Sequence, residues 1–149
     1  MNQLSKRCKY ALRALYRLNR EYETRLISVV EISEDQKIPR KFLETILVQL
    51  RNAGIVESQL GKRGGYRLAK SPEAITIGAV VRIVDGEIEP LPCVREKGAQ
   101  VCQECIGQRC ETRVIMRQVR DAIVAVLDHT TLAEACARSD AERELTYDI

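Results

Sequence analysis

Residues 37–69 read KIPRKFLETILVQLRNAGIVESQLGKRGGYRLA. In the first half of this stretch, four apolar side chains recur at i, i+3, i+4 and i+7, the spacing of one helix face: Leu43, Ile46, Leu47 and Leu50. Pro39 suits the start of a helix because its φ angle is fixed, and Gly54 suits the C-cap. We therefore predict a helix from Pro39 to Ala53 with an outward face made of Arg40, Lys41, Glu44, Thr45 and Val48.

The second half of the stretch predicts a β-hairpin. Residues 55–60 and 66–69 have the character of short strands, and the glycines in GKRGG, residues 61–65, permit a tight turn between them. Lys62 and Arg63 place two cations at the tip. An ordinary surface turn is the alternative, but the basic tip favours a DNA-contacting wing.

Two helices are predicted before this stretch. Residues 5–21 show an amphipathic pattern with a strongly basic second face, and Ser28 and Glu31 form a capping box that opens a short helix over residues 29–36. A short link joins that helix to Pro39, which makes a helix-turn-helix with residues 39–53 as the recognition helix. A helix-turn-helix followed by a basic hairpin is the element order of a winged helix.

The charge distribution supports nucleic-acid binding by the N-terminal half. Residues 1–70 contain 15 Lys and Arg against 7 Asp and Glu, whereas residues 71–149 contain 9 against 14. A basic half of this kind suits a polyanionic partner. The residues that we expect to contact DNA are Arg40, Lys41, Glu44, Lys62, Arg63 and Gly64. Each charged one could instead be a solvated surface group.

These expected contacts have different roles. Arg40 and Lys41 lie in the first turn of the recognition helix, from which side chains reach base edges or phosphates. Glu44 would be repelled by phosphate unless it accepts a hydrogen bond from a cytosine amino group, which makes it a candidate for sequence specificity.

The second half of the chain predicts a long exposed helix. A shorter helix over residues 76–86 is followed by a loop with Pro90, Pro92 and Gly98. Over residues 112–128 the apolar stripe is wider than one core contact requires, which favours dimerisation over packing within one chain. Thr131 and Glu134 resemble another capping box, and we expect the charged tail after about Ala137 to be frayed.

Four cysteines crowd the loop before this helix, at Cys93, Cys102, Cys105 and Cys110, in the spacing C-x8-C-x2-C-x4-C. Clustered thiolates without a secretory signal are typical of a site for a soft metal, either zinc or an iron–sulfur cluster. Cys8 and Cys136 are expected to be packing or surface thiols, although the cationic first helix could make Cys8 redox-active. His129, the one histidine, is expected to cap the long helix.

The composition is that of a globular protein, with 45% hydrophobic and 30% charged residues. No apolar run approaches the roughly 18 to 20 residues that cross a bilayer, and the N-terminus lacks a signal-peptide pattern. We expect a cytoplasmic protein that is mostly α with a small β-hairpin wing. Its expected parts are a winged helix (1–70), a connecting helix and loop (71–92), a cysteine-rich loop (93–110), a dimerisation region (111–137) and a charged tail (138–149).

Four segments together resemble the IscR/NsrR-type winged-helix regulators, the Rrf-two family of bacteria. They are SKRCKYALRAL (5–15), KIPRKFLETILVQLRNAGIVES (37–58), GKRGGYRLAKSPEAITIGAVVRIVDG (61–86) and CETRVIMRQVRDAIVAVLDHTTLAE (110–134). The resemblance covers the chain to about Ala137. It implies a homodimeric repressor on palindromic operator DNA, with a 2Fe-2S or 4Fe-4S cluster that senses iron, nitric oxide, redox or iron–sulfur status.

By position, the resemblance implies three cluster ligands, Cys93, Cys102 and Cys110. The residues after Cys110 include no histidine that would serve as the fourth ligand used by some members. Other members take an acidic residue from the partner's first helix, where this chain has Lys9 beside Cys8. We rank Cys105 first for this role and Cys8 second.

Two alternatives remain beside the cluster-based regulator. One is a zinc-stabilised or thiol-based DNA-binding regulator without a cluster. The other is a thiol oxidoreductase that uses Cys102-x-x-Cys105. The enzyme is disfavoured because a redox CxxC normally opens a helix beside a βαβ unit, and the sequence has no parallel-sheet pattern. We therefore expect no enzyme activity, no membrane association and no small-molecule substrate.

Overall fold

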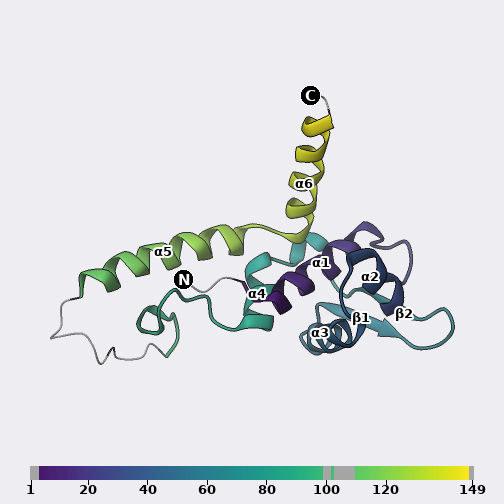
Figure 1. Cartoon of the computed structure of the whole chain (residues 1–149), viewed down its shortest axis with the longest axis horizontal. Coiled ribbons are helices and arrows are strands. Elements are labelled where there is room, and N and C mark those ends of the chain that lie inside the picture. Colours follow the sequence, from purple (N-terminus) through teal and green to yellow (C-terminus); the bar gives the residue numbers. More distant parts are fainter. Residues whose placement is uncertain (1–3, 99–101, 103–109, 148–149) are drawn as a thin grey trace.

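A computed structural model describes residues 4–98, 102 and 110–147. The elements in chain order are α1 (Lys6–Arg20), α2 (Val29–Gln36), α3 (Arg40–Asn52), β1 (Val56–Gln59), β2 (Gly65–Leu68), η1 (Pro72–Ala74), α4 (Ile77–Asp85), η2 (Pro92–Val94), α5 (Glu111–His129) and α6 (Leu132–Tyr147). The helices α1 to α4 and the hairpin form one body, from which α5 extends as an arm and α6 projects in another direction (Figure 1). The fold is the predicted winged helix with a long additional helix.

The apolar spacings seen in the sequence become the core. Helix α1 lies at its centre and packs against α2, α3, α4, α6 and β2. The predicted inner face of α3, Leu43, Ile46, Leu47 and Leu50, is fully buried. Local caps set the helix starts, since the hydroxyls of Ser5, Ser28 and Thr76 each accept a hydrogen bond from a backbone amide in the first turn.

The hairpin is antiparallel, with Val56 opposite Leu68 and Gln59 opposite Gly65. Its second strand is joined to the body by main-chain hydrogen bonds in both directions between Ile27 and Tyr66, at 3.0 and 2.8 Å. A Cβ on Gly65 would lie 2.5 Å from the carbonyl oxygen of Ile27, so this close approach requires glycine. The second strand is therefore fixed next to the turn, while the tip of the hairpin projects from the body (Figure 1).

The prediction of a frayed tail after Ala137 is wrong, because α6 continues to Tyr147. The predicted capping box at its start is present: Glu134 Oε2 accepts from the amide of Thr131 at 2.9 Å, and Thr131 Oγ1 accepts from the amide of Glu134 at 3.2 Å. After Ala137 the segment contains Arg138, Ala141, Glu142, Arg143 and Glu144, and Ala, Glu and Arg are strong helix formers. Charge alone was a poor guide to the end of this helix.

A junction fixes α5 to the body. The guanidinium of Arg82 on α4 makes two hydrogen bonds to the carboxylate of Asp128 on α5, at 2.6 and 3.0 Å. Just beyond α5, the amide of Ile77 donates to the carbonyl of Thr130 at 2.9 Å, and the amide of Leu132 donates to the carbonyl of Ile75 at 2.8 Å. The hydrogen bonds from Arg82 hold the pKa of Asp128 below its usual value.

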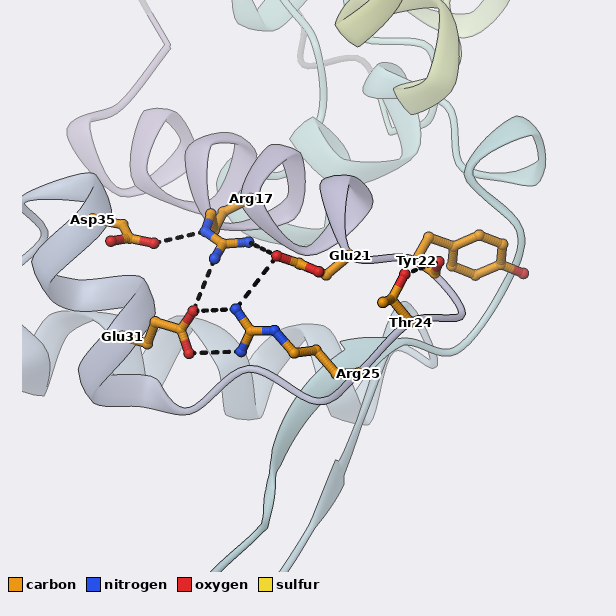
Figure 2. Close-up of polar contacts among 7 residues, drawn as sticks. All are labelled: Arg17, Glu21, Tyr22, Thr24, Arg25, Glu31 and Asp35. Carbon is orange, nitrogen blue, oxygen red and sulfur yellow. Dashed lines mark hydrogen bonds and ion pairs between the residues drawn. The ribbon is translucent and has the colours of Figure 1, made fainter.

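An ion-pair network joins α1 to α2, the first helix of the helix-turn-helix (Figure 2). Arg17, whose side chain is 12% exposed, contacts the carboxylates of Glu21 at 3.5 Å, Glu31 at 2.9 Å and Asp35 at 2.7 Å. Arg25 adds contacts to Glu31 at 2.5 Å and Glu21 at 3.3 Å. Glu31 is thus shared by both arginines. Hydrogen bonds from Arg25, and then the charges of Arg25 and Arg17, lower the pKa of Glu31.

We predict that Glu31→Gln destabilises the protein by about 1 kcal/mol near pH 7, the scale of a partly exposed ion-pair network. A carboxylate whose pKa is lowered by folding contributes stability above its unfolded pKa of about 4.3, and that contribution is lost as the pH falls through the folded pKa. The difference in unfolding free energy between variant and parent should therefore shrink at about pH 3, as measured by urea unfolding.

Glu34→Gln is the matched control, because Glu34 is exposed on the same helix and has no ion pair within the described chain. If Glu31→Gln lowers the unfolding free energy by the same amount at both pH values, the network does not stabilise the protein. The same holds if Glu34→Gln lowers the unfolding free energy as much as Glu31→Gln does.

Candidate nucleic-acid interface and thiol loop

The outer face of α3 is exposed as predicted, at Arg40, Lys41, Glu44, Thr45 and Val48. Arg40 and Glu44 are not independent, since Arg40 Nε donates to Glu44 Oε1 at 3.0 Å, one helical turn away. Both side chains are about half exposed or more, at 63% and 48%. Glu44 therefore sets the direction of the Arg40 guanidinium on the surface that a recognition helix presents to DNA.

An aromatic contact at the start of α3 was missed by the sequence analysis. Phe42 is 49% exposed although it lies in the first turn of α3, and its ring packs edge-to-face on Tyr10 of α1 with centroids 6.2 Å apart. The ammonium of Lys6 lies 5.7 Å from the centre of the Tyr10 ring. The sequence did contain a signal for this contact, because Phe42 is a large apolar residue that lies outside the i, i+3, i+4 stripe of α3. This contact fixes the start of the recognition helix against α1.

The hairpin tip presents two cations. Lys62 and Arg63 are exposed, and neither forms an ion pair within the described residues. The amide of Gly64 donates to the carbonyl of Gly61 at 3.0 Å, and Gly61 has a φ of 114°. A Cβ on Gly64 would lie 2.2 Å from the carbonyl oxygen of Gln59. Gly64, which we expected at the DNA, is thus needed to close the turn that displays Lys62 and Arg63.

The cysteines of the loop lie at its two ends and within it. Cys93 is half-buried in the turn η2, and Cys110 is the N-cap of α5, where its sulfur accepts a hydrogen bond from the amide of Arg113 at 3.4 Å. Cys102 is described and half-buried, whereas Cys105 lies outside the described residues. Within the described part of the chain, no group of three or more Cys, His, Asp or Glu side chains is close enough to hold a metal ion.

The thiols that are described have the chemistry that a metal site requires. Cys110 places its sulfur at the N-terminus of α5, where it accepts from a backbone amide, and the side chain of Cys93 is partly exposed to solvent. These two donors fit a soft metal or an iron–sulfur cluster. The described residues do not by themselves complete a ligand set.

Cys8 has a different character. It is 0% exposed in the core of the winged helix, and burial, followed by the charge of Asp85, raises the pKa of its thiol to about 11. A metal-free thiol with this pKa stays protonated near neutral pH, so Cys8 suits packing and does not suit redox reactivity. Cys136 is half-buried on α6, a separate helix that follows both the cysteine-rich loop and α5 in the sequence.

His129 ends α5 as predicted. Its Nδ1 lies 2.8 Å from the carbonyl oxygen of Ala125, one turn earlier in the same helix. A histidine at this position satisfies a free carbonyl at the helix end.

The fold and the exposed basic surfaces define a winged helix-turn-helix transcriptional regulator, and comparison with known proteins gives the family. Residues 4–138 match the family model Rrf2, described as an iron-dependent transcriptional regulator. The chain therefore belongs to the Rrf2 family of transcriptional regulators.

Three relatives illustrate the match. A putative HTH-type transcriptional regulator, rrf2-like, of Rhodobacter capsulatus is 34% identical over 97% of this chain and 99% of its own. IscR of Erwinia tasmaniensis is 34% identical over 89% of this chain and 77% of its own. The solved structure of CymR, the global cysteine regulator of B. subtilis, is similar with a TM-score of 0.79 and 30% identity, covering 93% of this chain and 98% of that one.

These relatives are named as transcriptional regulators, which supports a non-enzymatic protein and rules against the oxidoreductase interpretation. Across the residues that the structure describes, no helix is long and apolar enough to cross a membrane.

We predict that the double variant Lys62→Ala, Arg63→Ala weakens binding to all DNA sequences. Each lost phosphate contact should reduce the slope of log affinity against log salt by about 0.9. Fluorescence anisotropy with a specific and an unrelated duplex, at several salt concentrations, measures both effects.

Arg143→Ala removes an exposed cation of α6, outside both the winged helix and the cysteine-rich loop, and is the control. If the double variant keeps the parental affinity and salt slope, the hairpin tip does not contact DNA.

Proposed function

We propose that this chain is a homodimeric cytoplasmic repressor of palindromic operator DNA, controlled by an iron–sulfur cluster that Cys93, Cys102, Cys105 and Cys110 hold. The observation that carries the proposal is the placement of the thiols. Cys93 lies on a turn that packs against α5, and Cys110 begins α5 itself. A metal centre held between them would act on the helix that leaves the DNA-binding body.

The resemblance to IscR relatives favours an iron–sulfur cluster among the possible thiolate-bound groups. When bound, a cluster supplies a centre whose loss or change of state responds to oxidants, nitric oxide or iron supply. The family's own description as iron-dependent agrees with this choice. The chain's contribution is to supply thiolates from the two ends and the interior of one loop.

A zinc-bound or thiol-based regulator without a cluster is the second candidate. It is favoured by the similarity to CymR, which is described as a cysteine regulator and covers this chain as fully as the IscR relatives do. Both candidates use the same DNA-binding surface and differ in what the thiols hold.

The partner of α5 is proposed to be a second copy of the chain. In the described chain no residue of α5 is buried, although the helix carries the predicted apolar stripe. Its members Ile115 and Val126 are 53% and 63% exposed, Ala122 is exposed and Val119 is partly buried. These positions follow the alternating four and three spacing of helix pairs. A two-fold axis through this stripe would match two half-sites of a palindrome.

A two-fold dimer also explains how DNA spacing would be set. The Arg82–Asp128 pair and the main-chain hydrogen bonds beside it hold α5 at one angle to the winged helix. Pairing two such helices would fix the separation of two recognition helices at about 34 Å or a multiple, one DNA turn.

We predict that Val126→Glu converts the dimer into a monomer, because two carboxylates would face each other in an apolar seam. The monomer should stay folded, since Val126 has few contacts within its own chain. Sedimentation equilibrium measures the mass, and circular dichroism measures the helix content.

Arg117→Glu is the matched control for charge, because helical geometry places Arg117 on the opposite side of α5 from Val126. A dimer that survives Val126→Glu would place the interface elsewhere.

We predict that anaerobically purified protein is coloured and contains iron and sulfide. Single Ser substitutions at Cys93, Cys102, Cys105 or Cys110 should each abolish the full visible spectrum, because each removes one ligand. Cys136→Ser should leave the spectrum unchanged.

Metal analysis separates the two candidates. If the protein is colourless and contains stoichiometric zinc, it is the zinc-bound regulator and the iron–sulfur proposal is wrong. A protein without metal, whose DNA binding responds to thiol oxidation, would indicate the thiol-based one.

A further inference from the structure

The turn that carries Cys93 is joined to α5 by packing and by a hydrogen bond from Arg120. The side chain of Val94, next to Cys93, is 2% exposed, and η2 packs against α5. The carbonyl oxygen of Val94 accepts a hydrogen bond of 2.5 Å from an Nη of Arg120, a residue of α5. This carbonyl joins the turn to the helix through the main chain, so the contact does not depend on which side chain stands at residue 94.

The guanidinium of Arg120 is itself held in place. Asp121 accepts hydrogen bonds from its Nε at 2.9 Å and from its other Nη at 2.5 Å. The Arg120 side chain is only 17% exposed although α5 has no fully buried residue. An arginine oriented by a carboxylate on one edge presents its remaining N–H group in a fixed direction, here toward Val94.

The other side of the turn is closed by an ion pair. Arg95 donates two hydrogen bonds to the carboxylate of Glu89, at 2.5 and 2.7 Å, and the side chain of Glu89 is 13% exposed. Pro90 and Pro92 lie between the two partners and fix two of the φ angles. The segment from Glu89 to Arg95 is thus a closed and stiff turn with Cys93 inside it.

We propose that Arg120 is a positioning residue for the Cys93 thiol, which it holds beside α5 by binding the carbonyl of Val94. This inference rests on the proposed metal-binding role of Cys93. Cys110 lies ten residues before Arg120, at the start of the same helix, about 15 Å along its axis. The hydrogen bond restricts how far the Cys93 sulfur can move relative to α5, and a metal centre shared with Cys110 would form only where that restricted range reaches the start of the helix.

The proposal also explains why an arginine is needed. Without Arg120 the Val94 carbonyl would lose its hydrogen-bond donor while the Val94 side chain stayed in an apolar contact. Opening the turn toward water would then lower the free energy, because water would donate the missing hydrogen bond. A metal ligand on a loosened turn is held less firmly, and loss of such an outer partner typically weakens metal binding about 10 to 100-fold.

The first test uses the reduced, metal-free dimer. In Arg120→Ala the Cys93 thiol should react with iodoacetamide several-fold faster than in the parent, while the Cys110 thiol reacts at the parental rate; peptide mass spectrometry distinguishes the two. Arg117→Ala, an exposed arginine of α5 with no hydrogen bond or ion pair to the described residues, is the matched control. Circular dichroism and sedimentation verify that each variant remains a folded dimer.

The second test uses anaerobically reconstituted protein. Arg120→Ala should lose the visible absorption of its cluster to a chelator about 10 to 100 times faster than the parent. Arg120→Lys keeps one donor and should restore part of the difference, whereas Arg117→Ala should match the parent.

The two tests separate this inference from the proposed function. If Arg120→Ala shows the same Cys93 reactivity and the same rate of cluster loss as Arg117→Ala, Arg120 is not a positioning residue. If the parent protein assembles no cluster, the proposed function fails, and the alkylation rate of Cys93 alone decides whether Arg120 holds the turn.

Discussion

The bidentate ion pair between Arg82 and Asp128, with the main-chain hydrogen bonds beside it, sets the direction in which α5 leaves the winged helix. The pair is partly exposed, at 30% and 33%, so alone it contributes about 1 kcal/mol or less. The neighbouring Leu132 is 0% exposed, and burying such a side chain contributes about 1.5 to 3 kcal/mol. Packing therefore supplies most of the stability of the junction, and the ion pair sets the direction in which α5 leaves the winged helix.

Close approach at the junction is possible because position 78 is glycine. A Cβ there would lie 1.9 Å from Asp128 Oδ1 and 3.0 Å from an Nη of Arg82. The same helix α4 packs on α1, which in turn packs on the recognition helix α3. Between the thiol loop and the DNA-facing surface there is thus a continuous series of packed helices: α5, α4, α1 and α3. Under the proposed function, these packed helices are the contacts through which a metal centre at the start of α5 would act on the recognition helix.

Much of this fold follows from local sequence patterns. The inner face of α3, the caps at Ser28 and Thr131, and the extent of α5 were predictable because each depends on residues within a few positions of one another. The extension of α6 to Tyr147 was missed because charge was given more weight than helix propensity. The turns η1 and η2 were also missed, since each is a single short turn opened by a proline.

The candidate site was only partly predictable. The exposed cations of the hairpin and the spacing of the cysteines are visible in the sequence. The contacts of Arg120 with Val94 and of Tyr10 with Phe42 join residues 26 and 32 positions apart, which no local pattern reveals. The burial that keeps Cys8 protonated likewise depends on the assembled core, so its cationic helix alone suggested a reactivity that the fold does not support.

The proposed function requires that the cysteine-rich loop, residues 93–110, controls the affinity of the winged helix for DNA. The most direct measurement is the affinity of matched cluster-loaded and cluster-free dimers for one operator at a single salt concentration, by fluorescence anisotropy. We predict that the cluster-loaded form binds more tightly by roughly 5 to 150-fold, which corresponds to a coupling of about 1 to 3 kcal/mol. Equal affinities of the two forms for every native promoter tested would contradict it and reduce the metal centre to a structural role.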